Sequence, residues 1–158
     1  MRGGEMRTAV TLEGKLPKGF PRRALSDAAS YFARRSSSRC GLPFREVAVV
    51  FQNDGGSSEV HEAVMGDPSA TDVITQRYEP LPHEPPGVYG ELYVNVQRAR
   101  EYAASHAGCD PFEELLLYVA HGMDHLSGAD DLDARSRAAM RRRELGWIRD
   151  FRSGRGEG

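Results

Sequence analysis

The chain has 158 residues, a formal net charge of −2 at pH 7 and 39% hydrophobic residues. This length suits one domain with a core of its own, and the small net charge excludes a general polyanion-binding protein. Two cysteines without a CxxC pair argue against a disulfide framework and favour a reducing compartment. No apolar run approaches about 18 residues, and the N-terminus lacks a signal-peptide core. We therefore expect a cytoplasmic protein without a membrane partner.

Alternating and β-branched runs predict four strands, at residues 7–13, 46–52, 71–78 and 89–96. Helical periodicity and capping residues predict five helices. The first runs from Pro21 to the surface segment 34–38, and the others cover 57–65, 96–106, the stretch between Asp110-Pro111 and Ser127-Gly128, and 133–151. A turn is expected at 53–56, and the prolines of 79–87 exclude a regular element there.

The order of these elements predicts an α+β fold. We expect one domain over residues 1–158, with a four-stranded mixed sheet packed against about five helices and with loose tails at 1–5 and 152–158. In the last helix we expect core contacts from Ala134, Ala138, Leu145, Trp147 and Ile148. The run Arg141-Arg142-Arg143 is expected on a solvated face, and phosphate binding is its alternative role.

The helix that carries His121 and His125 follows the densest apolar run of the sequence, so we expect it at the centre of the fold. Histidines four residues apart lie one above the other on a helix. Gly128 is expected to end this helix, because glycine readily adopts the left-handed turn. The chain can then fold back and bring Asp130 or Asp131 toward the imidazoles. Two imidazole nitrogens and one carboxylate around an open position are typical of a catalytic zinc site.

Asp124 lies between the two histidines, and on a helix it flanks both of them. It is a candidate to orient an imidazole or to accept a proton during catalysis; the alternative is an aspartate on the surface. Asp130, Asp131 and Asp133 all precede the last predicted helix, so at least one of them is expected to cap it.

Two other classes of metalloenzyme share part of this pattern. A zinc peptidase of the HExxH type needs a glutamate directly after the first histidine, and Gly122 occupies that position. Ferrous oxygenases also use two histidines and one carboxylate, but the spacing on a helix disfavours that class.

Four segments of the chain occur in a familiar order. They are Ala70–Ile74, Gly90–Tyr93, Glu113–Leu115 and the motif, in which the matching residues are His121, Gly122, His125, Leu126, Gly128 and Asp130. Together they resemble the YbeY family of bacterial endoribonucleases, the rRNA maturation factors, from about Val47 to Trp147. The family hallmark is a histidine-glycine-x-leucine-histidine-leucine-x-glycine-tyrosine-aspartate-histidine run.

The resemblance implies a metal-dependent endoribonuclease that cleaves single-stranded RNA, matures the 3′ end of 16S rRNA and acts in ribosome quality control. It implies rRNA, the small ribosomal subunit and assembly factors as partners, and no DNA. The implied metal ligands are His121, His125 and Asp131, which would hold one Zn²⁺ or another divalent ion. His121, His125 and Asp124 are the expected catalytic residues.

The sequence departs from the family pattern at four positions. Asp131 stands where the family has its third histidine ligand, Ala129 replaces a tyrosine, Asp124 replaces a leucine, and Met65 occupies the position of a functionally important arginine. Arg45 or Arg77 is a candidate to replace that arginine. These departures also allow a catalytically impaired relative that serves as a ribosome-binding or RNA-binding module.

Overall fold

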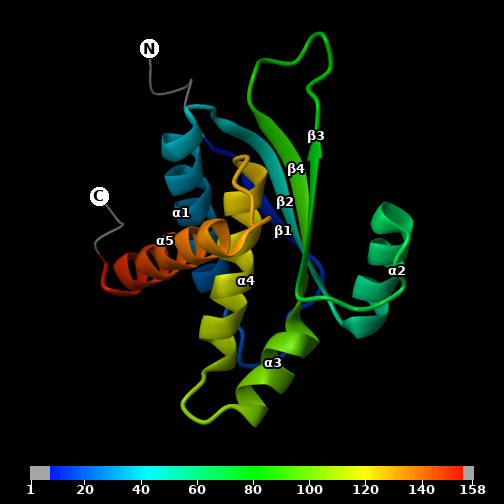
Figure 1. Ribbon diagram of the computed structural model, residues 1–158, viewed down its shortest axis with the longest axis vertical. Helices are drawn as coiled ribbons and strands as arrows, with labels where there is room; N and C mark the ends of the chain where they lie inside the picture. Colours follow the sequence, from blue (N-terminus) through cyan, green and yellow to red (C-terminus); the bar gives the residue numbers. More distant parts are fainter. Residues whose placement is uncertain (1–7, 155–158) are drawn as a thin grey trace.

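Four strands form one mixed sheet in the computed structural model, which describes residues 8–154 (Figure 1). The strands are β1 Val10–Glu13, β2 Phe44–Gln52, β3 Val73–Tyr78 and β4 Val88–Asn95. Their order across the sheet is β1-β2-β4-β3; β1, β2 and β4 are parallel, and β3 is antiparallel to β4. The predicted four-stranded mixed sheet is confirmed, with each strand close to its expected position.

Five helices surround this sheet: α1 Arg22–Cys40, α2 Asp54–Met65, α3 Val96–Ser105, α4 Pro111–Leu126 and α5 Ala134–Arg152. α1, α4 and α5 gather on one side of the strands, and α2 lies on the other side (Figure 1). α4 packs against α1, α3, α5, β3 and β4. The α+β class and the central place of the histidine helix are therefore confirmed. None of the helices within residues 8–154 is long and apolar enough to cross a membrane.

Two glycines allow α4 to lie unusually close to β4. A Cβ added to Gly122 would lie 2.8 Å from Leu92 Cδ2, and one added to Gly90 would lie 2.7 Å from Leu126 Cδ2. Both distances are shorter than a van der Waals contact, so a residue with a side chain fits at neither position unless the facing leucine moves. Packing against the sheet therefore favours glycine at position 122, directly after His121.

α2 begins earlier than predicted. The expected turn at 53–56 and the expected helix start at Ser57 are wrong, because the Asn53 side chain accepts a hydrogen bond from the Gly56 N–H and starts the helix at Asp54. Ser57 is buried instead, and its hydroxyl donates to the Thr71 carbonyl. A glycine pair normally disfavours a helix, and the cap outweighs that preference here.

The buried stripe of α5 also differs from the prediction. Trp147 and Ile148 are buried as expected, whereas Ala134, Ala138 and Leu145 are exposed, and Met140 and Glu144 take their places. The expectation fails because one member of the stripe is an acid, which a search for apolar periodicity assigns to the surface.

The ends of the last predicted helix are nearly as expected. Asp133 caps it by accepting a hydrogen bond from the Ser136 N–H, so one of the three candidate aspartates does act as a cap. Arg152 belongs to α5 rather than to a tail. The tail predicted at 1–5 and the end of the tail predicted at 152–158 lie outside the described residues.

Candidate metal centre

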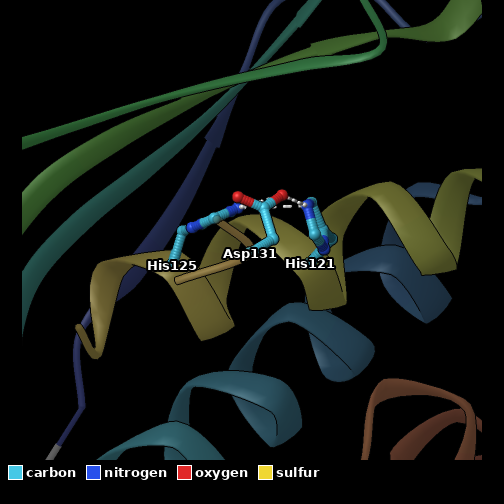
Figure 2. Close-up of side chains that lie close together, drawn as sticks. All are labelled: His121, His125 and Asp131. Atoms are coloured by element: carbon cyan, nitrogen blue, oxygen red, sulfur yellow. Dashed lines mark hydrogen bonds and ion pairs between the residues drawn. The ribbon is translucent and has the colours of Figure 1, made fainter. Parts of the chain in front are cut away.

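His121, His125 and Asp131 converge at the end of α4 (Figure 2). The two Nε2 atoms are 3.1 Å apart, and Oδ2 of Asp131 lies 3.5 Å from His125 Nε2 and 3.9 Å from His121 Nε2. The imidazole planes are nearly perpendicular, at 85°. The structure thus brings together the three residues that the resemblance names as metal ligands; their role as ligands stays a prediction.

The turn after α4 determines which aspartate reaches the histidines. Gly128 adopts a positive φ of 102°, and the Ala129 N–H returns to the Asp124 carbonyl. Asp130 accepts a hydrogen bond from the Leu132 N–H and is absent from the cluster, whereas the Asp131 carboxylate faces the imidazoles. The structure thus places Asp131, and not Asp130, beside the imidazoles, and its role as a ligand stays a prediction.

The hydrogen bonds on the far sides of the rings set the tautomers of both histidines. His125 Nδ1 lies 3.0 Å from the Ala129 carbonyl, which can only accept, so Nδ1 carries the proton. His121 Nδ1 lies 3.0 Å from both carboxylate oxygens of Glu144 and donates to them in the same way. Each neutral ring therefore directs an unprotonated Nε2 at the other.

This arrangement places three acceptors together without a donor among them. Two bare imidazole nitrogens 3.1 Å apart and a carboxylate repel one another unless a cation lies between them. Ligands about 2.0–2.2 Å from a tetrahedral zinc lie roughly 3.3–3.5 Å apart, which is close to the observed spacings. The Asp131 side chain is 39% exposed and free to approach a little further. The donor set and its geometry therefore fit a divalent metal ion.

Glu144 on α5 lies beside the cluster, where the sequence did not predict it. It is 1% exposed, and its carboxylate accepts the proton of His121 Nδ1. Burial raises the pKa of Glu144. Burial lowers the pKa of His121, whereas the neighbouring Glu144 carboxylate raises it. The net shift of this pKa is upward. The position of Glu144 on the buried stripe, four residues after Met140, was the one indication in the sequence that it faces inward.

Asp124 does not flank the imidazoles as expected. Its side chain is fully buried and accepts three hydrogen bonds from the Arg143 guanidinium, at 2.9–3.2 Å, while Arg39 Nε lies 3.8 Å away. The surface alternative is wrong, and direct proton transfer at the cluster is disfavoured because the carboxylate is turned toward arginines on α5 and α1. Arg143 is likewise no part of a solvated face, although Arg141 and Arg142 are exposed.

Two hollows border the cluster. One, of about 210 Å³, is lined by His121, Asp131 and Glu144 together with Arg137 and Arg141 of α5. The other, of about 420 Å³, lies on the His125 side. His121 and Asp131 thus face one hollow and His125 faces the other.

The hollow on the His125 side is where the family arginine is missing. Met65 is 68% exposed and lines it, as do His61 and Arg77. Arg77 Nη1 donates to the Leu126 carbonyl at the end of α4. Arg45 instead donates to the Pro86 carbonyl and does not line this hollow. Of the two arginines proposed as replacements, Arg77 is the one beside the centre.

The comparisons with known proteins agree with this geometry. The family model described as Endoribonuclease YbeY matches residues 19–152. The chain belongs to the YbeY family. It is 35% identical over 100 residues to Endoribonuclease YbeY of Protochlamydia amoebophila, covering 63% of this chain and 66% of that protein. It is 49% identical over 76 residues to the Rhodopirellula baltica protein of the same name, covering 48% and 38%.

The matched stretch thus spans about two thirds or less of these curated YbeY relatives. The solution structure of TM1509 from Thermotoga maritima is similar to this structure with a TM-score of 0.59 and 23% sequence identity, covering 95% of this chain and 96% of that one. At that identity the likeness concerns the fold alone, and it extends over nearly the whole YbeY-like domain.

Proposed function

We propose that this YbeY-family protein is a metal-dependent endoribonuclease that hydrolyses phosphodiester bonds of single-stranded RNA. The observation that carries the metal is the convergence of the Nε2 atoms of His121 and His125, 3.1 Å apart, beside the Asp131 carboxylate. Membership of the family supports RNA as the substrate. The proposed task is maturation of the 16S rRNA 3′ end and ribosome quality control in the cytoplasm, with the small ribosomal subunit or assembly factors as partners.

In this proposal His121, His125 and Asp131 hold one Zn²⁺ or another divalent ion, which supplies Lewis acidity toward a phosphate oxygen. The ring tautomers keep both Nε2 lone pairs available to the ion. Arg77 lies in the hollow beside His125, and Arg137 and Arg141 lie in the hollow beside His121. In the proposal these guanidinium groups contact phosphates on either side of the scissile bond.

We expect the protein purified without added metal to contain one divalent ion per chain, and we expect chelation to abolish RNA cleavage. The reason is that the three acceptors need a cation between them. Elemental analysis measures the ion, and cleavage of a single-stranded RNA before and after chelation, with and without added Zn²⁺, measures the dependence. Undiminished cleavage by fully metal-depleted protein would contradict the proposal.

The second candidate function is a ribosome-binding or RNA-binding module without catalysis. It is favoured by Met65, which leaves the family arginine position without a cation and is 68% exposed beside the centre. The same preparation separates the two functions: a bound metal together with RNA binding but no turnover favours the module, and metal-dependent turnover favours the enzyme.

Replacement of Arg77 by alanine is expected to weaken RNA binding about 10–100-fold, because a hydrogen bond to a charged phosphate contributes roughly 1.5–3 kcal/mol. The slope of log affinity against log salt concentration should also decrease in magnitude by about one, which corresponds to the loss of one phosphate contact. Binding is measured by titration of a single-stranded RNA at several salt concentrations. Arg45→Ala is the matched control, because Arg45 also donates to a backbone carbonyl but does not line the hollow beside His125. Equal losses in both variants would exclude Arg77 as the replacement for the family arginine.

A further inference from the structure

The Glu144 carboxylate accepts a hydrogen bond from His121 Nδ1, and no lysine or arginine of residues 8–154 lies within 4.0 Å of it. The carboxylate is 1% exposed, and a buried charge is costly unless it is paired and hydrogen-bonded. Asp124 is close by, but its charge is matched by Arg143 and Arg39. The N–H of the His121 imidazole is therefore the group that satisfies this buried carboxylate.

The two histidines are held by different parts of the chain. His125 donates to Ala129, four residues further along in the turn that follows its own helix. His121 donates to Glu144, which lies on another helix, 23 residues away in sequence. The orientation of His125 is thus a local property of the motif, whereas that of His121 depends on how α5 packs on α4.

The contact with Glu144 fixes both the rotation and the tautomer of the His121 ring. Nδ1 is equidistant, at 3.0 Å, from the two carboxylate oxygens, so the N–H points between them. A rotation of the ring by 180° would break this bond and remove Nε2 from the cluster. Without an acceptor at this position, the neutral ring is free to carry its proton on Nε2, where it would oppose a metal ion.

An adjacent ion pair aligns the two helices for this contact. Arg143 and Glu144 are consecutive on α5, and they bind Asp124 and His121, which are three residues apart on one face of α4. α5 crosses α4 at a steep angle (Figure 1), so these neighbouring contacts set the position of one helix along the other.

We propose that Glu144 is a positioning residue of the metal centre, which holds His121 with its Nε2 directed at the ion and makes metal binding depend on the docking of α5. This inference rests on the proposed function for its biological meaning. A partner of this kind on the far nitrogen of a histidine ligand typically changes metal affinity by about 10–100-fold.

The test compares Glu144→Gln and Glu144→Leu with the wild-type protein. In the metal-free proteins, nitrogen NMR of the imidazoles is expected to show His121 protonated on Nδ1 in the wild type and to lose that preference in Glu144→Leu. Competition with a chromogenic chelator is expected to show Zn²⁺ binding weakened about 10–100-fold in Glu144→Leu. Glu144→Gln is expected to lie in between, because its amide oxygen still accepts a hydrogen bond without the charge.

Arg142→Gln is the matched control, because Arg142 is an exposed neighbour on α5, and it should bind Zn²⁺ as the wild type does. Thermal unfolding of the metal-free variants separates positioning from a structural role. The His121 side chain is 31% exposed, and its neutral ring leaves no unpaired buried charge when Glu144 is replaced, so Zn²⁺ affinity should fall with little loss of stability.

Wild-type affinity and an unchanged His121 tautomer in Glu144→Leu would overturn the inference. If the wild-type protein itself bound no metal, the proposed function would fail, and the tautomer measurement would still decide whether Glu144 orients His121, because it uses the metal-free protein.

Discussion

Replacement of either His121 or His125 by alanine is expected to abolish metal binding and RNA cleavage together. Each variant leaves one imidazole and one carboxylate, which is too few protein ligands for a stable catalytic zinc site. The ion contributes several kcal/mol to stabilisation of charge in the transition state, and about 1.4 kcal/mol corresponds to a tenfold change in rate. The expected loss of cleavage is therefore about 10³-fold or more.

Single-turnover cleavage of a single-stranded RNA, measured beside the metal content of each variant, tests this prediction. His83→Ala is the matched control, since His83 is an exposed histidine in the loop between β3 and β4. It should retain metal and activity. Normal cleavage by a metal-free His121→Ala/His125→Ala double variant would refute the assignment of the centre to RNA hydrolysis.

The second large effect concerns stability. Arg143→Leu is expected to lower the free energy of unfolding by about 3–5 kcal/mol, because it leaves the charge of Asp124 buried and nearly unpaired. Asp124 is 0% exposed, and its other cation, Arg39, is 3.8 Å away. Asp124→Leu should cost less, since the Arg143 side chain is 25% exposed and can turn toward water.

The double variant Asp124→Leu/Arg143→Leu should recover most of the loss, because two apolar side chains in place of a buried ion pair are often no less stable. It also restores the leucine that the family has at position 124. Chemical denaturation of the four proteins forms a double-mutant cycle, and Arg142→Leu on the exposed face of α5 serves as the control. If Arg143→Leu proved no more destabilising than this control, the ion pair would not be a major source of stability.

The sequence predicted what depends on local patterns. The four strands and five helices follow from periodicity and capping residues, and the place of His121 and His125 on one face follows from their spacing. The arrival of an aspartate beside them follows from the left-handed turn at Gly128. The family resemblance named Asp131, and the structure places that residue rather than Asp130 in the cluster.

The errors arose where a residue's environment is made by a distant segment. Asp124 was expected beside the imidazoles, but its carboxylate is hydrogen-bonded to Arg143 on α5 and lies near Arg39 on α1. Ser57 was expected to start a helix that Asn53 begins. Arg45 and Arg77 were equivalent in sequence, and only the packing of β3 on α4 places Arg77 beside His125.

The sequence by itself therefore determined the class of fold, the pair of imidazoles and the approach of an aspartate to them, because a helix and a glycine turn fix the relative positions of residues within about ten positions of each other. Only the tertiary structure decided which ring nitrogen of His121 carries the proton. Glu144, which sets the His121 tautomer, lies on a different helix, and its acidic side chain gives no apolar signature of burial. A buried acid of this kind is stabilised by a partner on another helix. The periodicity of apolar residues along the sequence does not show that pairing.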